Sequence, residues 1–122
     1  MARLIIVDDD EDLLEMVSFV LRSQGMEIKS LSTGAPLFKL MAIEKPDMLV
    51  MDIYLGDMDG RTICKELKNT KEYSTVPVLL YSAGNISKTS IVDSLADDFL
   101  QKPFDVLTLV KRIEENIKKS RP

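Results

Sequence analysis

A short apolar run that ends in an aspartate, Met48 to Asp52, most constrains how this chain can fold. Its first four residues are all apolar, and it lies between Pro46 and Gly56. Runs of this kind are typical of strands that are buried on both faces, as in a parallel sheet with helices on either side. In open parallel sheets the ligand crevice lies outside the carboxyl ends of the strands. Asp52 is therefore placed for chemistry rather than for packing.

The rest of the chain alternates between short apolar runs and segments in which apolar residues recur at helical spacing. Acids precede the first helical segment, where they suit a helix N-terminus, and Gly25 closes it. We expect strands at 4–7, 27–31, 48–51, 76–81 and 99–100, each followed by a helix, with the last two helices over 85–95 and 105–118. The helix over 85–95 is predicted to be short and weakly capped. This order predicts an α/β fold, (βα)5, in which a doubly wound five-stranded parallel sheet carries helices on both faces.

Composition excludes several classes of protein. The 122 residues are enough for a single domain, 1–122, and the lone Cys64 cannot form an internal disulfide. The net charge of −4 argues against direct nucleic acid binding by this domain. The absence of histidine excludes histidine metal sites, Ser-His and Cys-His nucleophile pairs, and a phosphohistidine carried by this chain. No apolar run approaches a membrane span of about 20 residues and the start is unlike a signal peptide, so we expect a cytoplasmic protein without membrane contact.

Chemically active side chains follow four of the predicted strands, namely Asp8 and Asp9, Asp52, Ser82, and Lys102. Carboxylates that converge on one edge repel each other unless a cation lies between them. A set of carboxylates without histidine or thiolate favours a hard ion such as Mg²⁺. Lys102 and Ser82 suit the oxygens of a phosphoryl group, and Asp52 is then a nucleophile that forms an aspartyl phosphate.

Four segments together make the chain resemble the receiver domains of response regulators over nearly its whole length: IIVDDDED, LVMDIYLGDMDG, VLLYSA and ADDFLQKPF. The resemblance implies a flavodoxin-like sheet with the strand order 2-1-3-4-5. It also implies a phosphoacceptor of a two-component phosphorelay. Such a domain is a signalling switch rather than an enzyme, although it assists its own phosphorylation and dephosphorylation.

The resemblance assigns a role to each acid. Asp52 becomes the phosphoacceptor. Mg²⁺ is held by Asp9 directly and by Asp8 largely through water, together with Asp52 and the backbone carbonyl of Tyr54. A bulky Tyr54 also predicts slow loss of the phosphoryl group, because this position influences how water reaches it.

The remaining roles fall on the last two strands. Ser82 becomes the switch hydroxyl and Lys102 the phosphate-binding lysine, and with Asp52 they carry the chemistry. Phe99 stands where the family places an aromatic that turns inward on activation, although a plain core residue is an equal interpretation. The bond before Pro103 is expected to be cis.

The sequence departs from the family pattern in two places. Leu55-Gly56-Asp57 replaces the Met-Pro of many receivers, which predicts a loop that is freer to move. The segment from Ser82 to Lys102 is shorter than usual, and Leu95 stands where glycine is common. Because the fourth helix belongs to the usual signalling face, the chain is expected to be a monomer or a weak dimer.

The implied partner is a histidine kinase or a histidine phosphotransfer protein, since this chain has no histidine of its own. An output domain or a separate downstream protein would receive the signal. Two alternatives stay open at this point. One is a phosphatase of the haloacid dehalogenase type that uses Asp8 as its nucleophile, and the other is a pseudo-receiver that serves only as a docking module.

Overall fold

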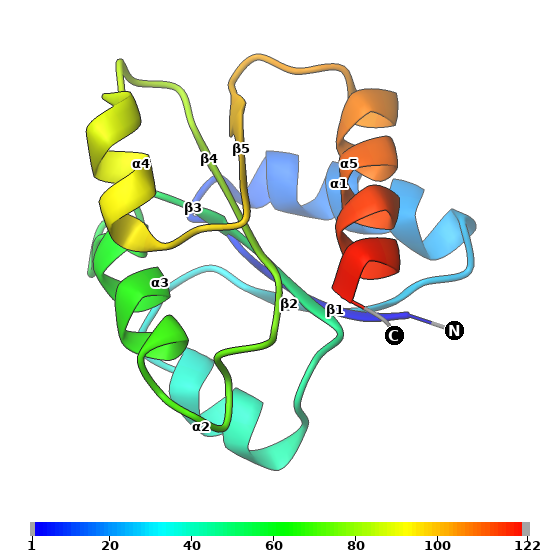
Figure 1. Ribbon diagram of the computed structural model, residues 1–122. Coiled ribbons are helices and arrows are strands. Elements are labelled where there is room, and N and C mark those ends of the chain that lie inside the picture. Colours follow the sequence, from blue (N-terminus) through cyan, green and yellow to red (C-terminus); the bar gives the residue numbers. More distant parts are fainter. Residues whose placement is uncertain (1, 121–122) are drawn as a thin grey trace.

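Five parallel strands alternate with five helices in the computed structural model, which describes residues 2–120. The strands are β1 (Arg3–Val7), β2 (Glu27–Leu31), β3 (Met48–Asp52), β4 (Val78–Ser82) and β5 (Asp98–Gln101). The helices are α1 (Glu11–Ser23), α2 (Leu37–Ile43), α3 (Gly60–Lys68), α4 (Lys88–Ser94) and α5 (Val106–Ser120). The sheet has the order β2-β1-β3-β4-β5, which confirms the predicted fold and topology (Figure 1).

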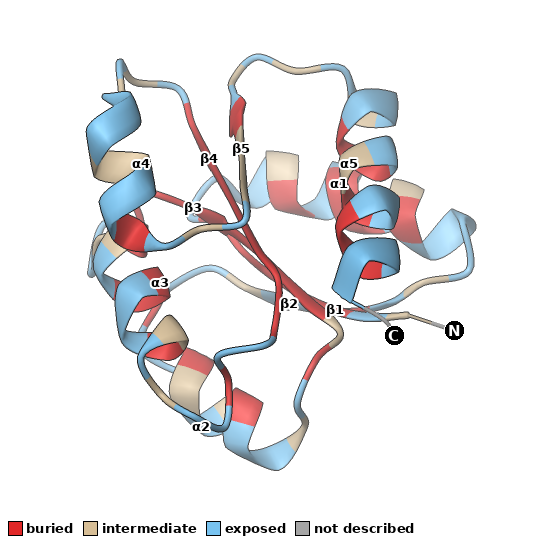
Figure 2. Ribbon diagram, in the orientation of Figure 1, coloured by how far each residue is buried: buried red, intermediate tan, exposed pale blue. Residues whose placement is uncertain are grey.

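Two apolar layers hold the helices against the sheet. Helices α1 and α5 cover one face, and α2, α3 and α4 lie on the other (Figure 1). Along β1, Leu4 and Ile6 enter the first layer whereas Ile5 and Val7 enter the second. Strands β1, β3 and β4 are therefore buried on both faces over nearly their whole length, as the continuous apolar runs predicted, and Figure 2 shows them as the buried centre of the molecule. The edge strands β2 and β5 are partly exposed.

The acids after β1 have two different roles: one caps α1, and the others lie at the edge of the sheet. Asp10 is the N-cap of α1, and its side chain accepts a hydrogen bond from the backbone N–H of Leu13. Gly25 follows the helix with φ of +86°, a conformation that glycine adopts at little cost. Since Asp10 serves as the cap, Asp8 and Asp9 are left for the edge of the sheet.

The region around α4 corrects three predictions: the bounds of the fourth strand, the start of the fourth helix, and the weak cap of that helix. Strand β4 begins at Val78 and includes Ser82, and α4 begins at Lys88 rather than at 85. The helix is short, as predicted, but its start is well capped, because the Ser87 side chain accepts a hydrogen bond from the N–H of Ser90. The helix ends at Ser94, and its C-cap residue, Leu95, has a left-handed φ of +66°.

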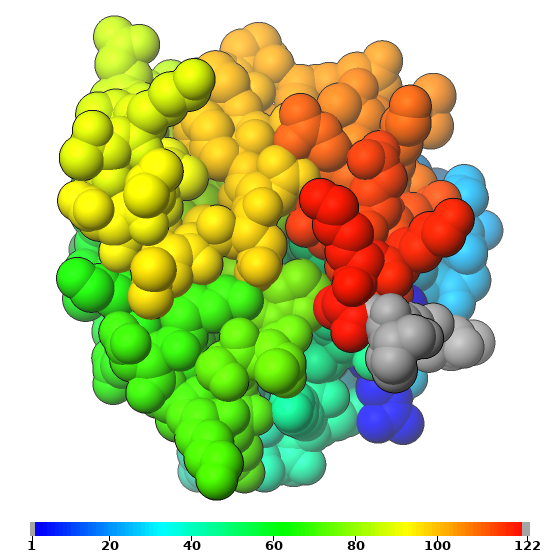
Figure 3. Space-filling model, viewed as in Figure 1, coloured from blue at the N-terminus to red at the C-terminus, as the bar shows by residue number. Residues whose placement is uncertain are grey.

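Helix α4 presents apolar surface to the outside. Val92 lies on this helix and is 71% exposed. Although α4 and α5 cover opposite faces of the sheet, Figure 3 shows both on the surface turned toward the viewer, with the chain around β5 between them. None of the helices described in residues 2–120 is long and apolar enough to cross a membrane.

Candidate functional site

The predicted site residues meet at the carboxyl edge of the sheet. Asp8 and Asp9 follow β1, Asp52 ends β3, Ser82 ends β4, and Lys102 follows β5. Strands β1, β3, β4 and β5 are consecutive neighbours in the sheet, so their ends lie side by side. Topology thus brings together side chains that are far apart in the sequence.

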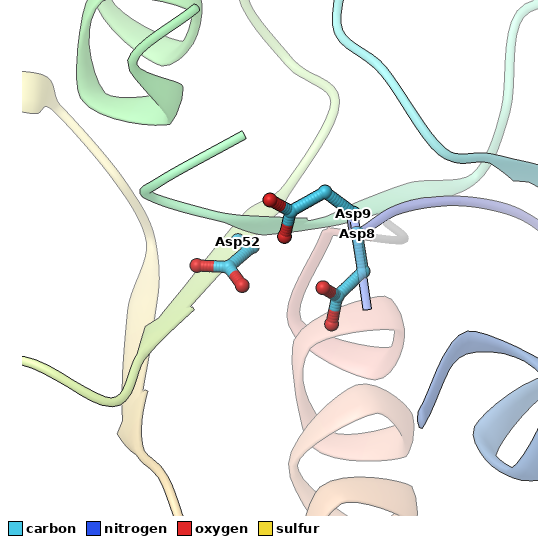
Figure 4. Close-up of side chains that lie close together, drawn as sticks. All are labelled: Asp8, Asp9 and Asp52. Atoms are coloured by element: carbon cyan, nitrogen blue, oxygen red, sulfur yellow. The ribbon is translucent and has the colours of Figure 1, made fainter. Parts of the chain in front are cut away.

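Three carboxylates form the centre of this edge. Asp8, Asp9 and Asp52 each offer an oxygen, and these atoms all lie within 4.8 Å of one another (Figure 4). Asp8 and Asp52 are buried, whereas Asp9 is exposed. A cluster of hard oxygen donors, two of them shielded from water, fits a divalent cation, as the sequence predicted.

Lys102 joins two of these acids. Its Nζ lies 2.8 Å from Oδ2 of Asp52 and 3.2 Å from Oδ2 of Asp8. Burial raises the pKa of Asp52, and although Lys102 works against this, the pKa stays above its ordinary value. Burial alone would lower the pKa of Lys102, but the hydrogen bond to Asp52 and the charge of Asp8 more than offset it, so the pKa is raised. Lys102 therefore stays charged. The peptide bond between Lys102 and Pro103 is cis, as predicted.

A tyrosine that the sequence prediction missed completes the surroundings of Asp8. The hydroxyl of Tyr81 donates a hydrogen bond of 2.7 Å to Oδ2 of Asp8, and the backbone N–H of Asp10 donates one of 2.9 Å to Oδ1. Burial and the neighbouring Asp8 raise the pKa of Tyr81, which keeps the hydroxyl protonated as a donor. The available signal was its position: a buried tyrosine next to Ser82 needs a partner for its hydroxyl.

Ser82 and Phe99 lie on the β4 and β5 side of the site. Ser82 is fully buried, and its hydroxyl oxygen accepts a hydrogen bond of 3.2 Å from the N–H of Gly84. Among the hydrogen bonds of residues 2–120, none joins this hydroxyl to Asp52 or Lys102. Phe99 is half-buried and packs against the apolar layer that contains α3, in keeping with its interpretation as a core residue.

Comparison with known proteins decides the family. A family model for the response regulator receiver domain matches residues 4–114. The chain belongs to this family. Phosphorylation-driven switching is typical of these signalling domains, and the match favours neither of the two alternative interpretations.

Similar proteins agree with the match. The receiver is 33% identical over 122 residues to the DNA-binding dual master transcriptional regulator RpaA of Synechocystis sp., covering 98% of this chain and 51% of that protein. It is 32% identical to the DNA-binding response regulator MtrA of Mycolicibacterium paratuberculosis, covering 97% and 52%. The receiver thus spans about half the length of these relatives. A crystal structure of a proposed response regulator from Chloroflexus aurantiacus J-10-fl superimposes with a TM-score of 0.90 at 34% identity, covering 96% of this chain and 98% of that one.

Tyr54 lies beside the acid cluster of the receiver. Its backbone N–H donates a hydrogen bond of 3.1 Å to Oδ1 of Asp52, while its side chain is 52% exposed. The guanidinium of Arg61 lies 5.7 Å from the centre of the Tyr54 ring, within the range of a cation–π interaction. A Cβ at Gly84 would lie 3.2 Å from the Tyr54 ring. The ring therefore bridges from the end of β3 toward the segment after Ser82.

The loop after β3 is better anchored than its sequence predicted. Leu55 is buried, and the Asp57 carboxylate accepts hydrogen bonds of 3.0 Å from the backbone N–H groups of both Gly34 and Ala35. These bonds lower the pKa of Asp57, because they stabilise the ionised carboxylate. The expectation of a freer loop overlooked them, since nothing in the sequence indicates that Asp57 reaches the start of α2.

Proposed function

We propose that the receiver is switched by transfer of a phosphoryl group to Asp52 from a phosphohistidine of a partner. The carrying observation is the buried Asp52 carboxylate, which lies between two further carboxylates and a charged lysine. An oxygen of Asp52 attacks phosphorus, the P–N bond to the donor breaks, and the imidazole leaves with its electron pair and takes up a proton. The donor histidine belongs to the partner, because this chain contains none.

We assign Mg²⁺ to Asp8, Asp9 and Asp52 together with the backbone carbonyl of Tyr54. When bound, the ion would neutralise charge as two anions approach each other. The protein contributes the fixed position of the acids: Asp8 is held by three donors, and Asp52 by Tyr54 and Lys102. This rigidity keeps the nucleophile in place without reorganisation during the transfer.

Ser82 and Lys102 then hold the phosphoryl group. Lys102 already lies 2.8 Å from Asp52, so it reaches phosphoryl oxygens with little movement. The Ser82 hydroxyl has to turn from the N–H of Gly84 to donate to them. That turn vacates space beside β5, which half-buried Phe99 fills by moving inward. The phosphoryl group thereby biases an equilibrium between two surfaces of the receiver.

The partners follow from this chemistry. A histidine kinase or histidine phosphotransfer protein supplies the phosphoryl group, and an output domain or a downstream protein reads the altered surface. RpaA and MtrA carry names of DNA-binding regulators, which supports an output of that kind. The receiver itself, with a net charge of −4, does not bind nucleic acid directly and acts as a monomer or a weak dimer.

The test is phosphorylation by acetyl phosphate with Mg²⁺, followed by mass spectrometry. The native protein and Asp57→Asn should both gain a phosphoryl group, and Asp52→Asn should gain none. Asp57 is a suitable control because it is exposed and near the site in sequence, yet outside the carboxylate cluster. An equal gain in Asp52→Asn, or labelling at Asp8, would overturn the proposal.

A further inference from the structure

The side chain of Tyr81 lies in the acid site, and it takes no direct part in the phosphoryl transfer described above. It is fully buried, and it pairs with Asp52 in the register of β3 and β4. Its ring stacks on Phe104, with 5.5 Å between the ring centroids. Its hydroxyl donates to Oδ2 of Asp8 at 2.7 Å. The phenol is therefore fixed at both ends, by an aromatic ring and by a carboxylate.

Oδ2 of Asp8 has two competing donors, Tyr81 and Lys102. The Lys102 ammonium lies 3.2 Å from this oxygen and 4.7 Å from the centre of the Tyr81 ring. Lys102 is also bonded to Asp52 at the shorter distance of 2.8 Å. The neutral phenol thus satisfies Asp8 without cancelling its charge, and it leaves Lys102 directed mainly at Asp52.

Removal of the Tyr81 hydroxyl would change how the donors are distributed between Asp8 and Asp52. Asp8 is fully buried, and a buried carboxylate needs donors. Among the described hydrogen bonds, Lys102 would be the only donor left on Oδ2, so the lysine would shift toward Asp8. A cation would then compete with a tighter ammonium–carboxylate pair for an acid that had also lost one of the donors that fix its orientation.

We propose that Tyr81 is a positioning residue of the acid site: its hydroxyl holds Asp8 in the orientation that receives a divalent cation and keeps Lys102 from neutralising it. The inference rests on the proposed function, because it takes the acid cluster as the Mg²⁺ site. Partners that orient metal-binding side chains through hydrogen bonds typically contribute about 10- to 100-fold to metal affinity. Tyr81 is expected to lie at the lower end, because the N–H of Asp10 still holds Oδ1.

The first test is the Mg²⁺ dissociation constant, measured by calorimetry without any phosphodonor. Tyr81→Phe should bind Mg²⁺ about tenfold more weakly than the native protein. Tyr73→Phe is the matched control, since Tyr73 is also buried but belongs to the layer around α2 and α3. Equal or tighter binding by Tyr81→Phe overturns the role of Tyr81 alone. A native protein without Mg²⁺ affinity overturns the proposed function as well.

A second test keeps Tyr81 in place and does not depend on the folding of Tyr81→Phe. The protein has three tyrosines and no tryptophan, so the double variant Tyr54→Phe/Tyr73→Phe emits from Tyr81 alone. Saturating Mg²⁺ should change this emission, because a cation on Asp8 would alter the charge of the carboxylate to which the Tyr81 hydroxyl donates. A purely structural tyrosine would not respond, and unchanged emission at saturation overturns the inference.

Discussion

At the residue scale, we expect Tyr54 to control access of water to Asp52. Its backbone is bonded to the Asp52 carboxylate, and its exposed ring is held beside Arg61 and the segment at Gly84. We infer that a ring in this position would hinder water from attacking a phosphoryl group on Asp52. The side chain is therefore expected to lengthen the lifetime of the signal, while the backbone N–H helps to position the nucleophile.

We expect Tyr54→Ala to shorten the lifetime of phosphorylated receiver several-fold, because removal of the ring opens the path for water. Tyr54→Phe retains the ring and should keep a lifetime close to that of the native protein. The measurement is loss of the acyl phosphate over time in isolated protein after the phosphodonor is removed. Equal lifetimes for the Ala and native proteins would contradict the role of the ring.

At the scale of elements, the sequence predicted what depends on local pattern. Continuous apolar runs located β1, β3 and β4, and helical spacing located α1 and α5. The strand-end residues lie at one edge of the sheet because parallel topology alone brings them together. Contacts between distant side chains were not predictable, such as Tyr81 with Asp8 and Asp57 with the start of α2. A sequence pattern shows where a polar side chain lies along an element, but not which distant donor it meets.

At the C-terminal end of α4, the residue type conflicts with the local backbone conformation. Leu95 adopts φ of +66°, where a side chain costs roughly 1–2 kcal/mol relative to glycine. Leu95→Gly should raise the free energy of unfolding by about 0.5–1 kcal/mol, after glycine's greater entropy in the unfolded chain is subtracted. Thermal denaturation measures this as a rise in Tm of a few degrees. Leu95→Ala retains the Cβ, so an equal gain there would show that the backbone conformation is not the cause.

The loop after β3 predicts a pH dependence. The folded-state pKa of Asp57 is lowered, so its contribution to stability is present above its unfolded pKa and is lost as pH falls through the folded pKa. Asp57→Asn should therefore lower Tm at neutral pH, and the gap from native protein should close in acid. Glu72→Gln, which removes an exposed carboxylate from the turn after α3, is the control for loss of a surface charge. A gap for Asp57→Asn that stays constant with pH would contradict the assignment.

At the scale of the whole molecule, the faces of the sheet provide stability, whereas its carboxyl edge holds the candidate site. Its two faces are covered by apolar layers, whereas its carboxyl edge gathers three carboxylates, two of which pair with Lys102. Like charges this close repel each other, and the two layers hold them together in spite of it. The receiver therefore gives up some stability at this edge, and a bound cation would restore it.

This balance predicts opposite effects of one substitution with and without Mg²⁺. In a chelator, Asp9→Asn should have a higher Tm than the native protein, because one repelling charge is gone. At Mg²⁺ a hundredfold above its dissociation constant, the native protein should gain about 2.7 kcal/mol, or roughly 10 °C in Tm for a domain of this size. Asp9→Asn should gain far less, so the order of the two Tm values reverses. Asp12→Asn, in the exposed first turn of α1 and outside the cluster, should keep the native gain. A full Mg²⁺ gain in Asp9→Asn would exclude Asp9 as a ligand and leave the cation to Asp52 and its other neighbours.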